Sequence, residues 1–509
     1  MFGSRPIFSR PVSLAAGLFT VLASCAPTYK EGLPPGSPFA EAAEAPLSSS
    51  SFPQGIASGD VTDHTAVIWT RTDGPQVVQA EWWEEQGSLT GDSVQDRVQA
   101  QHHPEVGAGQ TTALQATSAA DDYTVKVLVT GLRPSTRYRY RFWAAAGDAT
   151  GAFREVAKPS EEGTFRTAPL STEHSPITLL WSGDLGGQGR CRAGSEEYPI
   201  FDRMRNQRAD VMLFLGDTVY GDEICSAPPN VAGSSFAAQT ADQYRAKHRY
   251  QRGAASLRRF LAETPVLAIW DDHEVRNNFS GPYDSLMPAG RQALLEYWPI
   301  GTPQNDPTRL YRKFRYGADV ELFILDTRQY RSRNSDPDGP EKTMLGTKQR
   351  DWLLRGLSES TATWKVIVTS VPLSNSRKGG SLRAPGHDSW ARAADGTGFE
   401  HELRMIVETM VTKDIRNVVW LAADVHYVQA NAYDPSGDGE PDFHEFIAGP
   451  LSADPVRPVA PAPTFRPTTL FSDSGYFNFG VVTADRHRLQ VQIVDAEGTV
   501  RHTHQVMAR

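Results

Sequence analysis

The sequence predicts an α/β protein in which an N-terminal β-sandwich precedes a larger domain of layered strands and helices. Between residues 52 and 169, segments rich in β-branched and aromatic residues are separated by Gly, Asp, Pro and Ser, which is typical of strands joined by turns. Between residues 170 and 509, short and nearly continuous apolar segments alternate with helix-like segments. Strands that are covered on both faces require such apolar segments, so the second part is predicted to be an α/β layered domain.

Length and composition exclude several classes of protein. A chain of 509 residues is too long for one simple core, and 39% hydrophobic with 22% charged residues is ordinary globular composition. The 51 Lys and Arg against 60 Asp and Glu give a net charge of −9, which lacks the basic excess that wrapping DNA or RNA needs. We therefore expect no nucleic-acid binding platform. The three cysteines (Cys25, Cys191 and Cys225) are too few for a disulfide-stapled mini-domain.

Residues 1–25 predict an export signal. Arg5 and Arg10 precede an apolar segment over residues 12–23, which is shorter than the about 20 apolar residues that span a bilayer. The segment ends in Leu22-Ala23-Ser24-Cys25, which resembles the lipobox of bacterial lipoproteins. This resemblance implies that Cys25 is lipid-modified and becomes the mature N-terminus. An ordinary signal peptide with an incidental cysteine is the alternative.

Residues 26–51 are rich in Pro, Ala, Ser and Glu and predict a flexible tether. With the lipobox-like segment, this tether predicts an exported protein in the periplasm or at the cell surface. Acyl chains on Cys25 would then hold it at a membrane.

The N-terminal β-sandwich, residues 52–169, is predicted from strands at 66–71, 123–129 and 138–144. The segment from Leu132 to Tyr138 resembles the tyrosine corner of fibronectin-type sandwiches, in which a tyrosine hydroxyl caps a backbone carbonyl. We expect a fibronectin-like sandwich that carries no catalytic residues.

The second domain, residues 170–509, contains the alternating segments. Its apolar segments predict strands at 177–181, 211–215, 266–270, 322–325, 366–368 and 418–422. Helices are predicted at 195–208, 242–262, 347–358 and 398–411. Residues 476–506 alternate between apolar and polar and predict closing antiparallel strands.

Acidic residues and histidines follow several of these predicted strands. They are Asp184, Asp217, Asp271, Asp272, His273, Glu274, Asp326, Asp424 and His426. A single Asp after a strand is usually a helix cap or a turn residue. Because the carboxyl ends of strands in an α/β sheet open into one ligand crevice, however, these loops should converge. Carboxylates packed together need cations to stay ionised, so the sequence predicts a metal site.

The expected ligands are oxygens with one or two imidazoles and a tyrosinate. Such ligands suit hard or borderline cations, namely iron, manganese, calcium or zinc. Two such ions sharing an aspartate generate a hydroxide nucleophile and hold the oxygens of a phosphoryl group during in-line attack.

The blocks around these residues resemble the alkaline phosphatase D family, the PhoD-type branch of the calcineurin-like metallophosphoesterases. The resemblance runs from Phe52 almost to the C-terminus and rests on residues 52–60, 69–71, 216–220, 270–278, 325–331, 424–426 and 445–452. It implies a metallophosphoesterase α/β sandwich and a phosphoric ester hydrolase, either an alkaline phosphatase or a phosphodiesterase. Its substrate would be a phosphate ester, attacked by a metal-bound hydroxide, and its two metal ions would be iron and calcium, with manganese or zinc as alternatives.

The resemblance also implies roles for single residues. Asp217 would bridge the two ions and Tyr220 would bind a ferric ion, while Asp272, Asp424 and His426 would be further ligands. His273 would give a proton to the leaving oxygen. We expect Arg328 to contact phosphate through its planar guanidinium, with a structural salt bridge as the alternative. Asn278 is a weaker candidate for the same contact, and a plain turn residue is its alternative.

This chain departs from the family at the first strand end. Well-studied members have a Ser-Cys there whose cysteine ligates iron, whereas this chain has Ser182-Gly183-Asp184. We therefore assign Asp184 as a metal ligand. Cys191 and Cys225 occupy equivalent places in neighbouring strand-end loops, which favours a disulfide in an oxidising compartment. Cys191 as a metal ligand is the alternative.

One further motif and two alternative functions fit parts of the sequence. The segment from Asp434 to Glu445 fits part of a calcium-loop template, but its flanks look like strands and a solvated turn is preferred. A phospholipase D-like lipid headgroup hydrolase would suit an acyl anchor. A non-catalytic cell-envelope binding lipoprotein is the alternative from another class, and the intact Asp217, Asp272 and His426 argue against it.

Overall fold

The computed structural model describes residues 51–85, 109–147, 153–192, 198–225, 234–375 and 385–509. The described residues belong to one compact unit, residues 47–509. The predicted signal peptide, Cys25 and all of the tether except Ser51 lie outside the described residues. Among the residues that are described, no helix is both long and apolar enough to cross a membrane.

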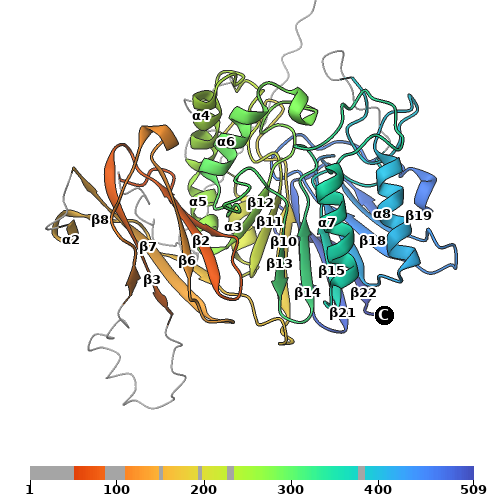
Figure 1. The fold of residues 1–509 in the computed structure, drawn as a ribbon, viewed down its shortest axis with the longest axis horizontal. Helices are drawn as coiled ribbons and strands as arrows, with labels where there is room; N and C mark the ends of the chain where they lie inside the picture. The colour runs from red at the N-terminus through yellow and green to blue at the C-terminus, as the bar shows by residue number, and fades with distance from the viewer. Residues whose placement is uncertain (1–50, 86–108, 148–152, 193–197, 226–233, 376–384) are drawn as a thin grey trace, which may run out of the picture. The chain divides into compact units, whose positions relative to one another are not determined.

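A nine-stranded mixed sheet is the first large layer (Figure 1). Its order is β22-β21-β20-β10-β11-β12-β1-β2-β6. The strands β10 (Ile177–Ser182), β11 (Val211–Leu215) and β12 (Val266–Ile269) are parallel, and β20 (Asn478–Ala484), β21 (Arg488–Asp495) and β22 (Val500–Met507) add antiparallel strands at one side.

The second large layer is a seven-stranded sheet with the order β13-β14-β15-β16-β18-β17-β19. Its strands are β13 (Arg312–Tyr316), β14 (Val320–Ile324), β15 (Trp364–Val368), β16 (Val418–Ala422), β17 (Val428–Tyr433), β18 (Phe443–Ile447) and β19 (Pro467–Asp473). β14, β15, β16 and β18 run parallel, so their carboxyl ends lie along the same edge of the sheet.

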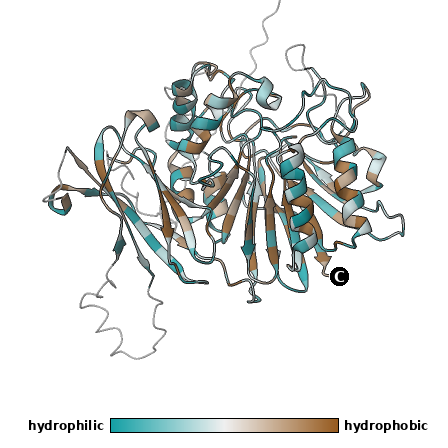
Figure 2. Cartoon of the chain, in the orientation of Figure 1, coloured by the Kyte–Doolittle hydropathy of each residue, from teal (hydrophilic) through white to brown (hydrophobic). Residues whose placement is uncertain are grey.

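Alternate residues of these strands belong to different cores. Leu322 and Ile324 of β14 share one buried core with Leu213 of β11, which joins the two sheets. Phe323, between them in sequence, belongs instead to the core under α7 (Gly346–Glu359) and α8 (Glu400–Thr412). The strands are therefore apolar throughout because both of their faces are covered, as Figures 1 and 2 show.

The remaining helices are α2 (Phe153–Val156), α3 (Ile200–Arg205), α4 (Ala241–Arg252), α5 (Ala255–Glu263) and α6 (Met287–Tyr297). The single helix predicted over residues 242–262 was wrong, because Ala254 is extended and separates α4 from α5. Helix α6 was not predicted, and Pro288 and Gly290 explain why, since both residues are typical of loops. Gly290 instead allows close packing: a Cβ there would lie 2.5 Å from the carbonyl oxygen of Glu274.

The N-terminal β-sandwich has a core of its own, which includes Ile68, Val78, Tyr140 and Phe142. One layer contains β1 (Ile56–Gly59), β2 (Thr65–Arg71) and β6 (Thr124–Thr130), and the other is built on β3 (Gln76–Glu84) and β7 (Arg137–Ala146) with the short β4 (Gln110–Thr111), β5 (Gln115–Ala116), β8 (Lys158–Pro159) and β9 (Gly163–Arg166). β1 pairs with β12, so the first layer continues the nine-stranded sheet.

The expected tyrosine corner differs in its hydrogen bonding. The hydroxyl of Tyr138 accepts the backbone N–H of Arg133 at 2.9 Å and donates to a carboxylate oxygen of Glu84 at 3.2 Å. The hydroxyl therefore accepts a backbone N–H of the corner instead of donating to a carbonyl, because it donates its hydrogen bond to Glu84 on the neighbouring strand.

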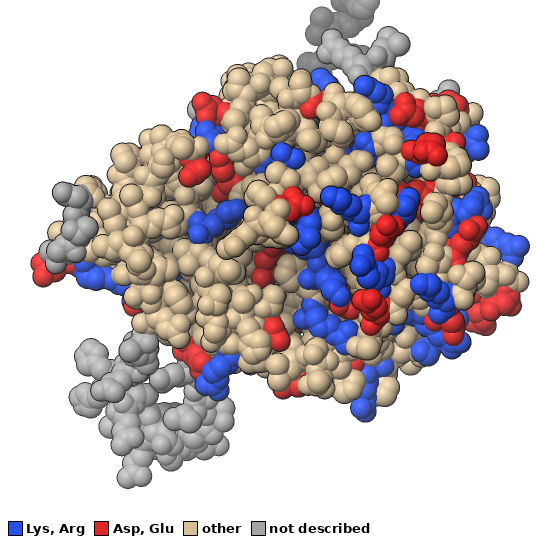
Figure 3. Space-filling view, viewed as in Figure 1, with Lys and Arg blue, Asp and Glu red and all other residues tan. Residues whose placement is uncertain are grey.

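Charged side chains are mixed over the face that carries α7 and α8. Figure 3 shows Lys and Arg lying beside Asp and Glu across this face. Several of these charges are paired, for example Arg404 with Glu400 at 3.4 Å within α8.

Candidate metal centre

The loops that follow the parallel strands of both sheets meet at one place. Candidate ligand atoms there form three groups, each within 4.8 Å: Asp184, Asp217 and His426; Asp217, Asp272 and His273; and Asp271, Asp272 and Asp424. Asp217 belongs to two groups and Asp272 to two, so the groups are continuous. The structure thus brings together the acidic strand ends of β10, β11, β12 and β16. Asp326 is the exception: it accepts Trp270 Nε1–H at 2.8 Å and backbone N–H groups, and is in none of these groups.

The backbone is strained at this place. Left-handed φ angles occur at Asp184 (+65°), Asp217 (+50°), Asn278 (+55°), Asp424 (+72°) and His426 (+56°). Each such residue costs of order 1 kcal/mol, and strain of this kind concentrates at functional sites. Four of the five residues are Asp or Asn, whose short polar side chains tolerate this conformation best.

Asp184, Tyr220 and His426 point at one another. His426 Nε2 lies 3.4 Å from Asp184 Oδ1 and accepts the Tyr220 hydroxyl at 3.1 Å. His426 Nδ1–H donates to the Asp454 carbonyl at 2.8 Å, so Nε2 is the ring nitrogen that can bind a metal ion. Asp184 Oδ2 is buried without a hydrogen-bond partner in the described structure. A partnerless carboxylate oxygen beside an imidazole and a phenol fits a metal ion.

Asp217 and Asp272 are buried, Asp424 is partly buried, and their carboxylates repel one another. Burial raises the pKa of Asp217 well above its usual range, and the charge of Asp272 raises it further. Burial, followed by the charge of Asp271, does the same to the pKa of Asp424. Burial also raises the pKa of Asp272 to about 6, and Asp272 Oδ1 has no hydrogen-bond partner among the described residues. Only added positive charge lets all of them ionise, so this set also fits a cation.

His273 is held by an acidic residue that the sequence analysis missed. Its Nδ1–H donates to Asp222 Oδ1 at 2.7 Å, and its ring stacks on Tyr220 with centroids 4.2 Å apart. Burial lowers the pKa of His273, but the charges of Asp272 and Asp222 outweigh burial and raise it well above its usual range. Its position two residues after Tyr220 is the sequence signal that could have identified Asp222.

Arg328 lies behind the carboxylates and forms ion pairs with them. Its side chain is 0% exposed. Nε and Nη2 donate to the two oxygens of Asp271 at 2.7 and 3.0 Å, and Nη1 donates to Asp388 at 3.1 Å. Burial raises the pKa of Asp271, but Arg328 outweighs burial and brings it to about 2. These three hydrogen bonds and the lack of exposed surface favour the salt-bridge alternative over a phosphate contact.

Two more acidic residues complete the surroundings: Glu274, which was expected at a strand end but without a role, and Asp388, which was missed from sequence. Glu274 accepts the backbone N–H groups of Asp217 at 3.2 Å and Asp271 at 2.9 Å, which ties the loops after β11 and β12 together. Asp388 follows no predicted strand. With its amide nitrogen turned toward the acids, Asn278 donates to Asp272 at 3.2 Å and to Asp388 at 3.1 Å. Asn278 is thus at the centre rather than in a remote turn.

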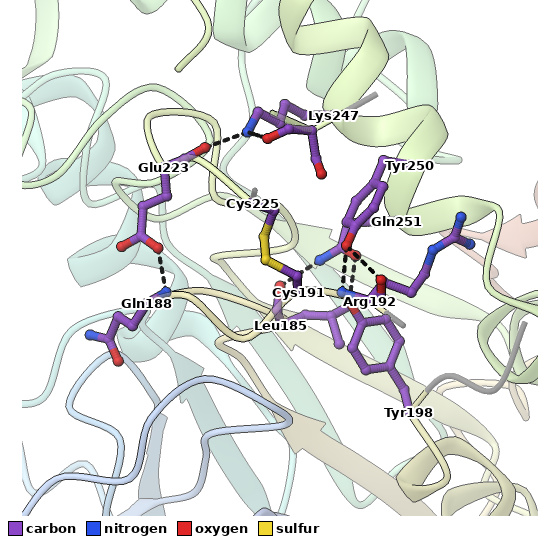
Figure 4. The surroundings of a disulfide bond; sticks show 11 residues. Leu185, Gln188, Cys191, Arg192, Tyr198, Glu223, Cys225, Lys247, Tyr250 and Gln251 are labelled. Atoms are coloured by element: carbon purple, nitrogen blue, oxygen red, sulfur yellow. Dashed lines mark hydrogen bonds between the residues drawn. A yellow bond between two sulfur atoms is a disulfide. The ribbon is translucent and has the colours of Figure 1, made fainter. Parts of the chain in front are cut away.

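Cys191 and Cys225 form a disulfide with Cα atoms 5.4 Å apart (Figure 4). Their sulfurs are bonded to each other, so Cys191 is not a metal ligand in this structure. The segment at Asp434 is a turn: the Asp434 carboxylate accepts the backbone N–H groups of Gly437 at 2.7 Å and Gly439 at 3.1 Å. These bonds occupy the carboxylate that a calcium loop would offer to the ion.

Comparisons with known proteins agree with this architecture. The family model described as PhoD-like phosphatase matches residues 187–502, and the model of the PhoD-like phosphatase N-terminal domain matches residues 39–169. Alkaline phosphatase D of Bacillus subtilis is 28% identical over 411 residues, which are 75% of this chain but only 65% of that relative.

Two solved structures have the same fold. The structure described as PhoD has a TM-score of 0.70 at 22% identity and covers 91% of this chain and 92% of its own. A purple acid phosphatase from yellow lupin seeds has a TM-score of 0.57 at 14% identity and covers 89% of this chain and 73% of its own. The chain belongs to the PhoD-like phosphatase family.

Proposed function

We propose that this protein is a metal-dependent phosphoric ester hydrolase that acts on phosphate monoesters or diesters. The observation that carries the proposal is the pair of overlapping ligand groups that share Asp217, with buried oxygens on Asp184 and Asp272 that have no hydrogen-bond partner among the described residues. The relative named alkaline phosphatase D supports the same class of reaction.

Asp184, Asp217, Tyr220 and His426 would hold a first metal ion, and Asp217, Asp272 and Asp424 a second. Bound at these residues, the ions supply a hydroxide nucleophile and neutralise charge on phosphate oxygens. Iron and calcium are the proposed resident ions, and manganese and zinc are the alternatives that the same oxygen and nitrogen donors accept.

The protein's own residues supply the other parts of the reaction. His273 Nε2, which lies 3.9 Å from Asp272, would give its proton to the leaving oxygen, and Asp222 holds Nδ1 so that Nε2 faces the centre. Asn278 would donate one N–H of its side-chain amide to a phosphate oxygen in place of Asp388. Arg328 is proposed as a positioning residue that holds Asp271 and Asp388 beside the ligands.

The reaction is tested on purified protein loaded in turn with iron, calcium, manganese and zinc. Hydrolysis of p-nitrophenyl phosphate, bis-p-nitrophenyl phosphate or phosphatidylcholine vesicles separates monoesterase, diesterase and phospholipase D-like activity. We expect Asp217→Asn to abolish hydrolysis and Asp434→Asn, in the exposed turn, to leave it unchanged. Metal-loaded protein that hydrolyses none of the three would favour the non-catalytic binding lipoprotein.

Export and anchoring are a separate part of the proposal. Residues 1–25 would direct export, Cys25 would carry the acyl chains, and residues 26–51 would link the membrane to the domains at 52–169 and 170–509. In the bacterial host, we expect Cys25→Ser to move the protein from the membrane to the soluble fraction and to stop incorporation of an alkyne-labelled fatty acid. Labelling that persists in Cys25→Ser would contradict the anchor.

A further inference from the structure

The loop after β10, residues 185–192, borders the first metal site on several sides. It begins directly after Asp184. At Gly187 a Cβ would lie 2.1 Å from the ring of Tyr220, so the backbone of the loop lies directly against that ring. Gln188 Oε1 accepts the N–H of Asp454 at 3.1 Å, and the Asp454 carbonyl accepts His426 Nδ1–H at 2.8 Å. The Leu185 N–H donates to the Asp217 carbonyl at 2.9 Å, so the loop touches or supports all four proposed ligands.

The disulfide joins the far end of this loop to the loop that contains Tyr220. Cys191 lies in the first loop and Cys225 in the second. The Gln188 N–H also donates to the Glu223 carboxylate (Figure 4). The Glu223 N–H donates to the Tyr220 carbonyl at 3.4 Å. The two strand-end loops are thus joined by the disulfide after Tyr220 and by the hydrogen bond from the Leu185 N–H to the Asp217 carbonyl before it.

Each loop is also attached to α4 without the disulfide. Gln251 Nε2 donates to the Leu185 carbonyl at 2.6 Å, and the Arg192 N–H donates to the hydroxyl of Tyr250. On the other loop, Lys247 donates to the carbonyl oxygens of Glu223 and Ser234. Removing the disulfide therefore leaves both loops on the helix. What the disulfide alone supplies is a covalent tie between the loop that carries Gly187 and the loop that carries Tyr220.

We propose that the Cys191–Cys225 disulfide is a positioning element of the first metal site, where it keeps the residue 185–192 loop closed over Tyr220. Without it, the ion held by Asp184, Tyr220 and His426 leaves more readily, while the ion held by Asp272 and Asp424 is unaffected. This inference rests on the metal binding of the proposed function, but not on ester hydrolysis.

The test compares metal release from wild-type protein and from Cys191→Ser/Cys225→Ser. Both are loaded with Zn²⁺, and transfer of Zn²⁺ to the chelator 4-(2-pyridylazo)resorcinol is followed by absorbance. The kinetic phase of Zn²⁺ release that is absent in His426→Ala is assigned to the ion of the first site. We expect the double variant to release this ion at least about tenfold faster, as loss of ligand-supporting contacts does, and to release the second ion at the wild-type rate.

A matched control separates positioning from general loss of stability. Asp60→Asn breaks the remote ion pair with Arg312, whose atoms are 2.9 Å apart, and should release both ions at wild-type rates. Equal first-site rates in wild type and double variant overturn the proposal, as does acceleration of both ions or equal acceleration in Asp60→Asn.

The serine introduced at position 225 can by itself prevent folding, because it places a hydroxyl where Cys225 is only 7% exposed. If the serine variant does not fold, Cys191→Ala/Cys225→Val and thiol-reduced native protein take its place, with the same outcomes. Absence of ester hydrolysis in wild type overturns the proposed reaction but leaves the release rates interpretable.

Discussion

His273 and Asp222 form a part-buried pair in which the Nδ1–H of the histidine donates to the carboxylate at 2.7 Å. The Asp222 carboxylate also accepts the backbone N–H of Asn277 at 2.8 Å, so the acid cannot turn away from the ring. Burial raises the pKa of Asp222, but the charge of His273 outweighs burial and lowers it. The pair therefore keeps a proton on the imidazole and directs its second nitrogen to the centre.

The loss of kcat on removal of the proton donor His273 should depend on the leaving group of the ester. We expect His273→Ala to lower kcat by about 10² to 10⁴-fold for alkyl phosphate esters, because an alkoxide leaves slowly without a proton. p-Nitrophenyl phosphate should be affected much less, since p-nitrophenolate is a stable leaving group. Rates for a series of esters with different leaving groups measure this dependence. An equal loss for all esters would show that His273 does not donate the proton.

Asp222→Asn should reproduce the same pattern more weakly. The amide can still contact Nδ1 but carries no charge, so the imidazolium is less stabilised while its ring stays stacked on Tyr220. We expect a fall in kcat with little change in KM, again larger for alkyl esters. A change in KM alone would assign Asp222 to substrate binding instead.

The strand-end acids were predictable because a buried strand and an acid after it are both local patterns. Asp184, Asp217, Asp272, Asp424 and His426 all follow apolar segments, and the parallel strands bring them together. The parallel strands β10, β11, β12, β14, β15 and β16 and the helices α7 and α8 were predictable for a similar reason, since continuous apolar segments of strand length and helix-like segments are also local patterns.

Features that depend on approach in space were not predictable. Asp388 follows no strand and reaches the centre only through Arg328 and Asn278. A phosphate-binding arginine and a buried salt-bridge arginine look identical in sequence, and only the 0% exposure of Arg328 distinguishes them. The break between α4 and α5 likewise depends on one residue, Ala254, whose extended backbone leaves no mark on the apolar pattern.

Arg328 should contribute strongly to stability. Arg328→Met leaves Asp271 and Asp388 buried without their cation, which costs about 3–5 kcal/mol in comparable buried pairs. Urea denaturation of the metal-free protein measures the change in the free energy of unfolding. As a control, Arg416→Met removes an exposed pair with Asp414 and should not change the urea midpoint. A midpoint unchanged in Arg328→Met would contradict the structural role.

Asp184 should determine which metal the first site prefers. Asp184→Cys replaces a hard carboxylate by a thiolate, which favours zinc over manganese. We expect the Zn:Mn ratio, measured by elemental analysis after loading with equal concentrations of both, to rise at least about tenfold. Asp184→Asn keeps the size and tolerates the left-handed φ of +65°, so it controls for shape and should only weaken binding. An unchanged ratio in Asp184→Cys would place Asp184 outside the ligand set.

His248 should make the protein less stable in acid, independently of the metal centre. It is 1% exposed, stacks on Tyr297 with centroids 5.2 Å apart, and has no hydrogen-bond partner among the described residues. Burial, and then the charge of Arg252, lower its pKa to about 3. Between pH 6.5 and 3 the unfolded chain therefore binds a proton that the folded protein does not, and stability falls as the pH falls.

His248→Phe removes this proton while keeping a flat ring against Tyr297. The free energy of unfolding of His248→Phe minus that of wild type should increase by about 2 kcal/mol when the pH is lowered from 8 to 5. This value follows from a His248 pKa of about 3 in the folded protein and about 6.5 in the unfolded chain. Other titrating groups, including the metal centre, are common to both proteins and cancel in this difference. Denaturation of the metal-free proteins at both pH values measures it. Parallel curves would mean that His248 takes up its proton in the folded state, which its burial beside Arg252 opposes.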